Sequence, residues 1–220
     1  MNQHLRHLRV ILTMLLAIAG TAEAADAAGV SLASLTEVQK YERAIHIMVM
    51  LLIGFGFLMV FVKKYGRSAL TATYLLVSVS LPLYFLKESV LGADHTLGVI
   101  DKLILAEFAA ASLLICAGAV LGRLKMNQYL LLGLLFVPLY TLNEWIVLNG
   151  GFGLITGKVM DTGGSIVIHA FGAIFGLGVA AAMTTKRELE TPIVCDNTSD
   201  RFSLLGSMAL GMPIAFALLA

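Results

Sequence analysis

The stretch of sequence that decides the fold reads Asp161-Thr-Gly-Gly-Ser-Ile-Val-Ile-His169-Ala-Phe-Gly-Ala-Ile-Phe-Gly-Leu177, and its apolar part continues to Met183. Such a run is long enough to cross a bilayer as a helix. Its glycines recur at short spacings that let neighbouring helix backbones approach closely. His169 lies in the middle, where an ionisable side chain is costly unless it faces a protein interior or a wet pathway. The stretch therefore predicts a membrane helix that carries a candidate transport site.

The composition of the whole chain supports an all-α polytopic membrane protein. Of its 220 residues, 59% are hydrophobic and 13% are charged, and the mean hydropathy is +0.90. A soluble globule of this size needs more polar surface. The net charge of +1 argues against a nucleic-acid partner, which calls for a clustered basic face. Cys116 and Cys195 form neither a disulfide framework nor a paired-thiol metal motif.

Hydrophobic runs separated by short polar breaks predict six transmembrane helices. Each run has about the length that a helix needs to span a bilayer. The expected spans lie near residues 44–62, 68–86, 103–121, 129–148, 163–183 and 202–219.

The first residues have the pattern of a secretory signal peptide. Arg6 and Arg9 supply a positive start, residues 10–18 form an apolar core too short to span, and Ala22-Glu-Ala24 resembles a cleavage site. We expect a signal peptide over residues 1–24 and a membrane domain over residues 25–220. The alternative is an uncleaved membrane anchor, which the short apolar core disfavours.

Loop charges predict the orientation in the cell membrane. The breaks at residues 63–67, 123–125 and 186–187 are basic, whereas residues 87–102 and 149–161 are mixed or nearly uncharged. The positive-inside rule places the basic breaks in the cytoplasm and the N-terminus outside. The signal peptide predicts the same topology.

Three acidic residues near the expected span ends are candidates for function. Glu107 lies near the start of the third span and Glu144 near the end of the fourth, both on the external side. Two carboxylates at one mouth attract a cation, but carboxylates at helix ends are also ordinary interfacial residues. For Glu144 these two interpretations weigh equally. Asp161 precedes the fifth helix, where a carboxylate can cap free backbone N–H groups and orient the helix.

Two other histidines, His46 and His95, are weaker candidates for a functional role than His169. His46 lies just inside the first span, where a satisfied interfacial histidine is at least as plausible as a functional one. His95 lies in a polar external loop and is expected to be solvated. The sequence contains no nucleophile paired with a base and no cluster of metal ligands, so an enzyme is not expected.

Several blocks together resemble Rhesus-type proteins of the ammonium transporter superfamily. The resemblance runs from about Tyr41 to Gly206. Its blocks, in order, are residues 41–66, Glu107-Phe108 with residues 118–122, Asn143-Glu144, the stretch 161–177, and Ser199-Asp-x-Phe202.

This resemblance implies a homotrimer in which each protomer holds its own narrow apolar pore. His169 then matches the first of a pair of pore histidines, and Phe108 matches a position that helps to close the outer mouth. Glu107 and Glu144 match acids of the outer vestibule. Ammonium would be drawn to this mouth and would lose a proton, because moving a bare charge through a dry pore is expensive. Neutral imidazole can donate and accept hydrogen bonds along an ammonia path, and neither a metal nor an organic cofactor is needed.

The chain also departs from the family pattern. Members have roughly eleven or twelve spans built as two inverted halves, and the second pore histidine comes from the second half. This sequence corresponds to the first half and ends at Ala220, inside what would be the first helix of the second.

Three functional alternatives follow from that departure. The first is a truncated or separately encoded part of an ammonium/ammonia channel, partnered by further copies or by a complementary second half. The second is a non-conducting half or an assembly subunit. The third is a channel for carbon dioxide, which an apolar pore also admits.

Overall fold

The computed structural model describes residues 31–61, 66–90, 97–157, 159–183, 185–186, 190 and 196–219, with the side chains of 88–90 and 213–219 left out. The expected signal peptide over residues 1–24 lies outside the described residues, as do His95, Cys195 and most of the basic break at 63–67. The chain divides into two compact units, residues 1–41 and 42–220. All regular elements in the described ranges are helical, as the sequence predicted.

The first span is one continuous helical segment built from four elements. They are α2 (Leu32–Val49), the π-helix η1 (Met50–Phe55), α3 (Gly56–Leu58) and the 3-10 helix η2 (Met59–Phe61). The helix begins at Leu32, well before the expected start of the span at Ala44. Ser31 explains this start, because its Oγ accepts a hydrogen bond from the backbone N of Ser34 at 3.1 Å and so caps the first turn. Hydropathy marks only the apolar part of such a helix.

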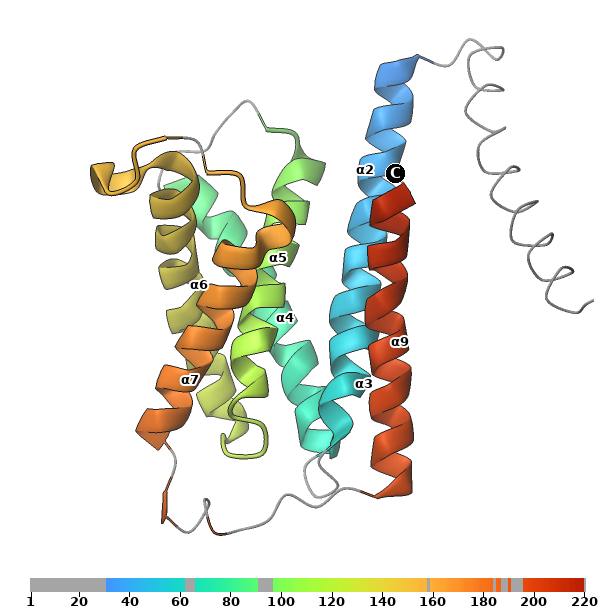
Figure 1. Ribbon diagram of the computed structural model, residues 1–220, viewed down its shortest axis with the longest axis vertical. Coiled ribbons are helices and arrows are strands. Elements are labelled where there is room, and N and C mark those ends of the chain that lie inside the picture. Colours follow the sequence, from blue (N-terminus) through green and yellow to red (C-terminus); the bar gives the residue numbers. More distant parts are fainter. Residues whose placement is uncertain are drawn as a thin grey trace, which may run out of the picture. The chain divides into compact units, whose positions relative to one another are not determined.

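The other five expected spans each correspond to a helix within the described ranges (Figure 1). They are α4 (Gly66–Val90), α5 (Val99–Gly118), α6 (Met126–Asn149), α7 (Phe171–Met183) and α9 (Asn197–Leu219). Short helices η3 (Gly151–Gly153), η4 (Thr162–Gly164) and η5 (Ser165–Ala170) connect α6 to α7.

Four of these helical segments are long and apolar enough to cross a membrane. They are Leu32–Phe61, Gly66–Lys87, Met126–Asn149 and Thr162–Met183. In contrast, α5 carries the charged residues Asp101, Lys102 and Glu107. Its apolar character is therefore concentrated in its C-terminal half.

The core is built around α5, which packs against α4, α6, α7 and η5. Figure 1 shows α5 in green among these helices. Its buried face consists largely of alanine and leucine, including Ala106, Ala109, Ala110, Leu113 and Leu114. Small side chains let neighbouring helices approach closely without a void, which matters in lipid because association depends on packing.

Helix α7 lies against α5 through two glycines. A Cβ on Gly172 would come within 2.6 Å of the Ser112 carbonyl oxygen, and one on Gly176 within 2.9 Å of the Cys116 carbonyl oxygen. Ser112 Oγ also donates a hydrogen bond to the Ile168 carbonyl at 2.8 Å. These contacts set the depth of η5 and α7 against the core, and therefore the position of the histidine stretch.

Helix α9 packs against η1 and α3 in the same way. A Cβ on Gly206 would overlap the backbone N of Leu58. The rings of Phe57 and Phe202 stack with centroids 5.6 Å apart. The last helix of the chain is thus closely joined to the first span.

Candidate functional site

The carboxylate of Asp161 holds the start of η5. Its Oδ1 accepts a hydrogen bond from the backbone N of Ile166 and its Oδ2 accepts one from the backbone N of Val167, both at 2.9 Å. These N–H groups belong to the first turn, where a helix has no internal partners for them. A carboxylate there also lies favourably at the positive end of the helix dipole. Asp161 therefore orients the segment that carries His169.

The two glycines after Asp161 make a turn that other residues adopt with difficulty. Gly163 and Gly164 both have φ of +67°, in the left-handed region, which glycine enters without the steric cost of a Cβ. At Gly164 a Cβ would also overlap the side chain of Ile168. The Asp161-x-Gly-Gly motif thus forms the turn that leads into η5.

His169 lies in η5 and is exposed on the surface of this chain. Its Nδ1 lies 3.1 Å from the carbonyl oxygen of Gly164. The segment around it has π-helical hydrogen bonding, a rare local geometry that often occurs at functional sites. The histidine is therefore directed outward from the helix bundle and held by its own turn.

The exposed surface around His169 is apolar. Ile166, Ile174 and Leu177 are 47%, 69% and 67% exposed, and Ala170 and Ala173 are exposed between them. These exposed aliphatic side chains belong to the same helical segment as the imidazole, η5 and α7. We call His169 and these five residues the His169 face.

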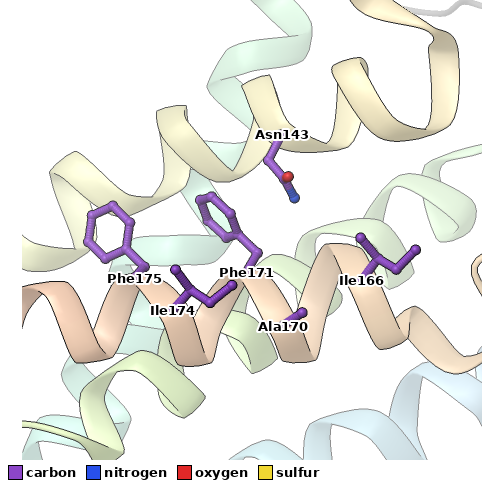
Figure 2. Close-up of a pocket in the computed structure, with 6 residues that line it drawn as sticks. All are labelled: Asn143, Ile166, Ala170, Phe171, Ile174 and Phe175. Atoms are coloured by element: carbon purple, nitrogen blue, oxygen red, sulfur yellow. The ribbon is translucent and has the colours of Figure 1, made fainter. Parts of the chain in front are cut away.

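A shallow pocket of about 230 Å³ opens beside this face, between α6 and η5–α7. Figure 2 shows Asn143 extending from α6 toward the lining residues of the facing helix, which are Ile166, Ala170, Phe171, Ile174 and Phe175. Asn143 is the polar member of this lining. Its Nδ2 donates a long hydrogen bond of 3.5 Å to the Val167 carbonyl. The pocket can hold a small apolar group at the edge of the His169 face.

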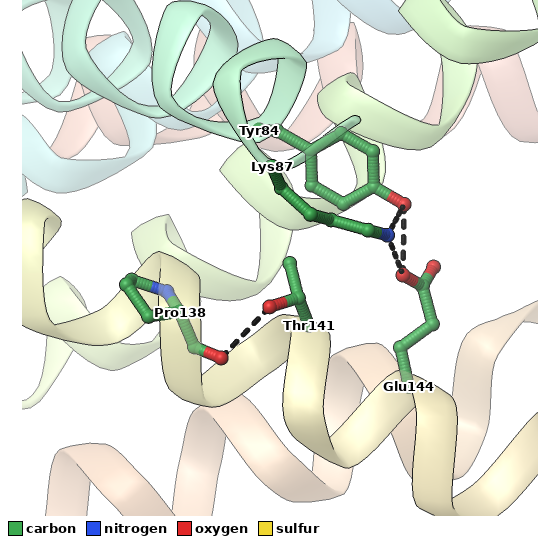
Figure 3. A network of polar contacts seen from close by, with 5 residues as sticks. All are labelled: Tyr84, Lys87, Pro138, Thr141 and Glu144. Atoms are coloured by element: carbon green, nitrogen blue, oxygen red, sulfur yellow. Dashed lines mark hydrogen bonds and ion pairs between the residues drawn. The ribbon is translucent and has the colours of Figure 1, made fainter. Parts of the chain in front are cut away.

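Glu144 joins α6 to α4 through a charged cluster. Its Oε2 accepts hydrogen bonds from Tyr84 Oη at 2.7 Å and from Lys87 Nζ at 3.2 Å. Lys87 Nζ also lies 4.3 Å from the centre of the Tyr84 ring. Figure 3 shows these three side chains meeting between the two helices. The pairing offsets the negative charge of Glu144, and so weakens its attraction for a cation in solution.

Sequence reasoning did not find Tyr84 and Lys87. One signal could have indicated the lysine, because Lys87 and Glu144 lie near the C-terminal ends of helices predicted to finish on the same side of the membrane. Nothing in the spacing of Tyr84 marks it as a partner of Glu144. The cluster depends on the packing of α4 against α6.

Glu107 and Phe108 lie further from the start of their helix than the expected span placed them, because α5 begins four residues before residue 103. Because α5 begins at Val99, Glu107 lies two helical turns inside it. Glu107 is 1% exposed, and its Oε2 has no hydrogen-bond partner among the described residues. Phe108 is half-buried and packs against the core. Their roles in recruitment and closure stay predictions.

His46 is half-buried on α2, in a different helix from His169. Within the described ranges, no three His, Cys, Asp or Glu side chains gather closely enough to hold a metal ion. Among the described residues, His169 is the exposed histidine, and it lies on an apolar surface.

Membrane-length helices packed through glycines define a polytopic membrane protein, and this one holds an imidazole outward on an apolar face. The chain belongs to the Ammonium Transporter Family, which its residues 10–212 match. This match confirms the resemblance seen in the sequence.

Relatives and one solved structure agree with this assignment. The chain is 38% identical over 173 residues to the ammonium transporter Rh type C of Xenopus tropicalis, covering 74% of this chain and 35% of that protein. It is 36% identical over 170 residues to the ammonium transporter Rh type B of Mus musculus, with the same shares covered. A structure described as Nitrosomonas europaea Rh50, of the Rhesus protein family of channels, is 54% identical with a TM-score of 0.75. That match covers 80% of this chain and 47% of the other.

The chain therefore spans about a third of the length of the curated relatives that it matches. It spans about half of the solved structure.

Proposed function

We propose that this chain supplies one wall of an ammonium/ammonia channel, with the His169 face lining the path. The exposure of His169 within an aliphatic surface carries this proposal. An ionisable side chain in contact with lipid is costly, and such groups ordinarily face a bundle interior or a water-containing cavity. A covered His169 face would satisfy that requirement and would form a narrow apolar passage.

The conducted species in this proposal is ammonia, which forms at the mouth when ammonium gives its proton to the water outside. A cation loses most of its hydration in an apolar passage, so its transfer as a charge is expensive. A neutral ammonia molecule avoids that cost and can still hydrogen bond to the neutral imidazole of His169. The chain then acts as a channel and not as an enzyme.

Recruitment of ammonium is assigned to acids near the outer ends of α5 and α6. Glu144 remains a candidate, although its ion pair with Lys87 reduces its field. Glu107 is buried, so it would attract a cation only after the cation has entered the protein. Phe108 is proposed to close the mouth above the path.

The His169 face needs a cover, which we propose to be a complementary set of helices in the same assembly. Further copies of the chain would complete a trimer, as the sequence resemblance implies. The alternative, a non-conducting assembly subunit, is favoured by the same exposed face, because the face by itself encloses no passage. Transport measurements separate the two.

The proposed orientation places the N-terminus outside the cell membrane and the basic breaks in the cytoplasm. It rests on the loop charges and on the expected signal peptide over residues 1–24.

A substitution at His169 tests the proposed function. The chain, together with a complementary half from a Rhesus-type relative, is expressed in a cell strain that lacks its own ammonium transporters. His169→Ala should abolish most methylammonium uptake while membrane abundance stays unchanged. Ile174→Ala is the matched control, because Ile174 is also exposed on the His169 face but carries no polar atom. Loss of His169→Ala protein from the membrane, with normal uptake per remaining molecule, would reject the proposal.

A further inference from the structure

We propose that the turn after α6 is a membrane-interface anchor, which places Trp145 and Phe152 in the layer of the bilayer where headgroups meet acyl chains. We call Trp145, Phe152 and Leu154 the interface patch. Its partner is a lipid surface. The proposal concerns a different part of the chain from His169, and it does not depend on whether the chain conducts ammonia.

The interface patch is unusually apolar for a turn between two helices. Phe152 and Leu154 are each 70% exposed, and Trp145 is also exposed. No charged residue occurs from residue 145 to residue 157. A turn that lies in water is ordinarily polar, and exposed apolar groups that gather together mark a contact surface. The turn is therefore suited to an apolar partner.

The two aromatic rings are held together by the shape of the turn. The ring centroids of Trp145 and Phe152 are 4.9 Å apart with an interplanar angle of 81°, which is an edge-to-face arrangement. Gly151 passes directly against the indole, where a Cβ would overlap the ring. Gly150 ends α6 in the left-handed region, at φ of +67°, and donates its backbone N–H to the Trp145 carbonyl. The turn thus brings Phe152 back to the end of the helix that carries Trp145.

Phe152 holds this position at a conformational cost. Its φ is +58°, in the left-handed region that bulky side chains rarely adopt. Glycine and asparagine adopt this conformation more easily. Residues held in such conformations cluster at functional sites. Because the Phe152 side chain is largely exposed, burial within this chain does not account for a phenylalanine here.

A lipid surface is favoured as the partner because the interface patch continues the apolar face of α6. Leu131, Leu135 and Leu142 are exposed, and their spacing places them on the same helix face as Trp145. This helix is long and apolar enough to cross a membrane. Figure 1 shows the turn at the end of α6, on the side away from α5. Tryptophan is enriched where a spanning helix leaves the hydrocarbon, since its ring suits lipid and its N–H suits the headgroups.

The tryptophan content of the chain makes the proposal directly measurable. Trp145 is the single tryptophan among the 220 residues, so the fluorescence of the unmodified chain reports on this position. The purified full chain is reconstituted in phosphatidylcholine vesicles whose acyl chains carry bromine, either near the glycerol end or near the terminal methyl. We expect stronger quenching by bromine near the glycerol end, and little quenching by acrylamide dissolved in the water.

Three results of this measurement would overturn the proposal. Strong quenching by acrylamide without quenching by bromine would place the interface patch in water. Resistance to both quenchers would show that protein covers the patch, either a second copy of the chain or other helices. Stronger quenching by bromine near the terminal methyl would place the indole in the hydrocarbon core, below the interface.

Variants at residue 152 separate the role of the turn from that of α6. Phe152→Asn suits the left-handed backbone but removes the ring, so we expect loss of most quenching by bromine near the glycerol end and a gain in quenching by acrylamide. Phe152→Tyr keeps a ring suited to the interface and should behave as the unmodified chain does. Met160→Ala is the control, because Met160 is an exposed apolar residue of the same connection outside the patch, and it should leave the quenching unchanged.

Unchanged quenching in Phe152→Asn would show that Phe152 does not hold the indole at the interface, and would contradict the anchor. The measurement on the unmodified chain decides the location of Trp145 even if Phe152→Asn fails to accumulate.

Discussion

Lys87 Nζ lies 3.2 Å from Glu144 Oε2, and this ion pair ties α4 to α6. Both side chains are largely shielded, with 25% and 11% of their surfaces exposed. Removing one member of such a pair leaves the other charge without its partner, which costs more stability than replacing both. The two residues can therefore be tested by single and double variants.

Removing the lysine alone should destabilise the protein. Lys87→Met leaves the Glu144 carboxylate hydrogen-bonded to Tyr84 but without its cation, and a shielded charge without its counter-ion is unfavourable. We expect a loss of about 1–3 kcal/mol, below the value for a fully buried pair because Lys87 is partly exposed. Thermal unfolding in detergent measures the loss. The double variant Lys87→Met/Glu144→Gln should be more stable than Lys87→Met, and strictly additive losses would contradict the pairing.

The buried carboxyl group of Glu107 should lower the stability of the folded protein relative to a glutamine at the same position. Its Oε2 is buried without a hydrogen-bond partner among the described residues, and burying a charge costs more than burying a neutral amide of similar size. Glu107→Gln is therefore expected to unfold at the same temperature or higher, by an amount on the order of 1 kcal/mol. If the same variant lowers methylammonium uptake, Glu107 acts in recruitment. A marked loss of stability would show that the carboxylate has a partner.

Glycine is required where α7 contacts α5, at Gly172 and Gly176, but not at Gly178. Gly172→Ala pushes a Cβ against the Ser112 carbonyl, whereas Gly178 has nothing within 4 Å of its Cβ position. We expect Gly172→Ala to cost about 1–3 kcal/mol through overpacking. Gly178→Ala should be neutral or slightly stabilising, since alanine favours a helix more than glycine does. Membrane abundance and thermal unfolding of the two variants test this difference, and equal effects would contradict the close approach.

The orientation can be tested by cysteine labelling in intact cells. In a Cys195→Ser background the remaining Cys116 is buried. A cysteine placed at Ala28 should react with a membrane-impermeant thiol reagent, because the N-terminus is proposed to lie outside. A cysteine at Arg67 should not react until the cells are opened. The reverse pattern would overturn the proposed topology.

Local motifs predicted the capped turn before His169 because its parts are close in sequence. Asp161, Gly163, Gly164 and His169 fall within one turn and the helix that follows it, so spacing alone places the carboxylate at the first free N–H groups. The positions of the spans could likewise be predicted from hydropathy, since each run must match the bilayer thickness.

Contacts between distant helices could not be predicted in the same way. Tyr84 and Lys87 meet Glu144 across about sixty residues, and only the packing of α4 on α6 brings them together. The burial of Glu107 was also not predicted, because it depends on the helices that pack around α5. The start of α5 at Val99 was missed as well, because a polar turn precedes its apolar run. A helical turn that contains charged residues can extend a helix, but it does not raise the hydropathy from which the span was predicted.

Methylammonium uptake into liposomes tests the central claim most directly. The purified chain is reconstituted alone and with a complementary half from a Rhesus-type relative. We expect little uptake by the chain alone, because the His169 face is then uncovered, and efficient uptake with the complementary half that is lost in His169→Ala. Robust uptake by the chain without any partner, or partnered uptake indifferent to His169→Ala, would contradict this account.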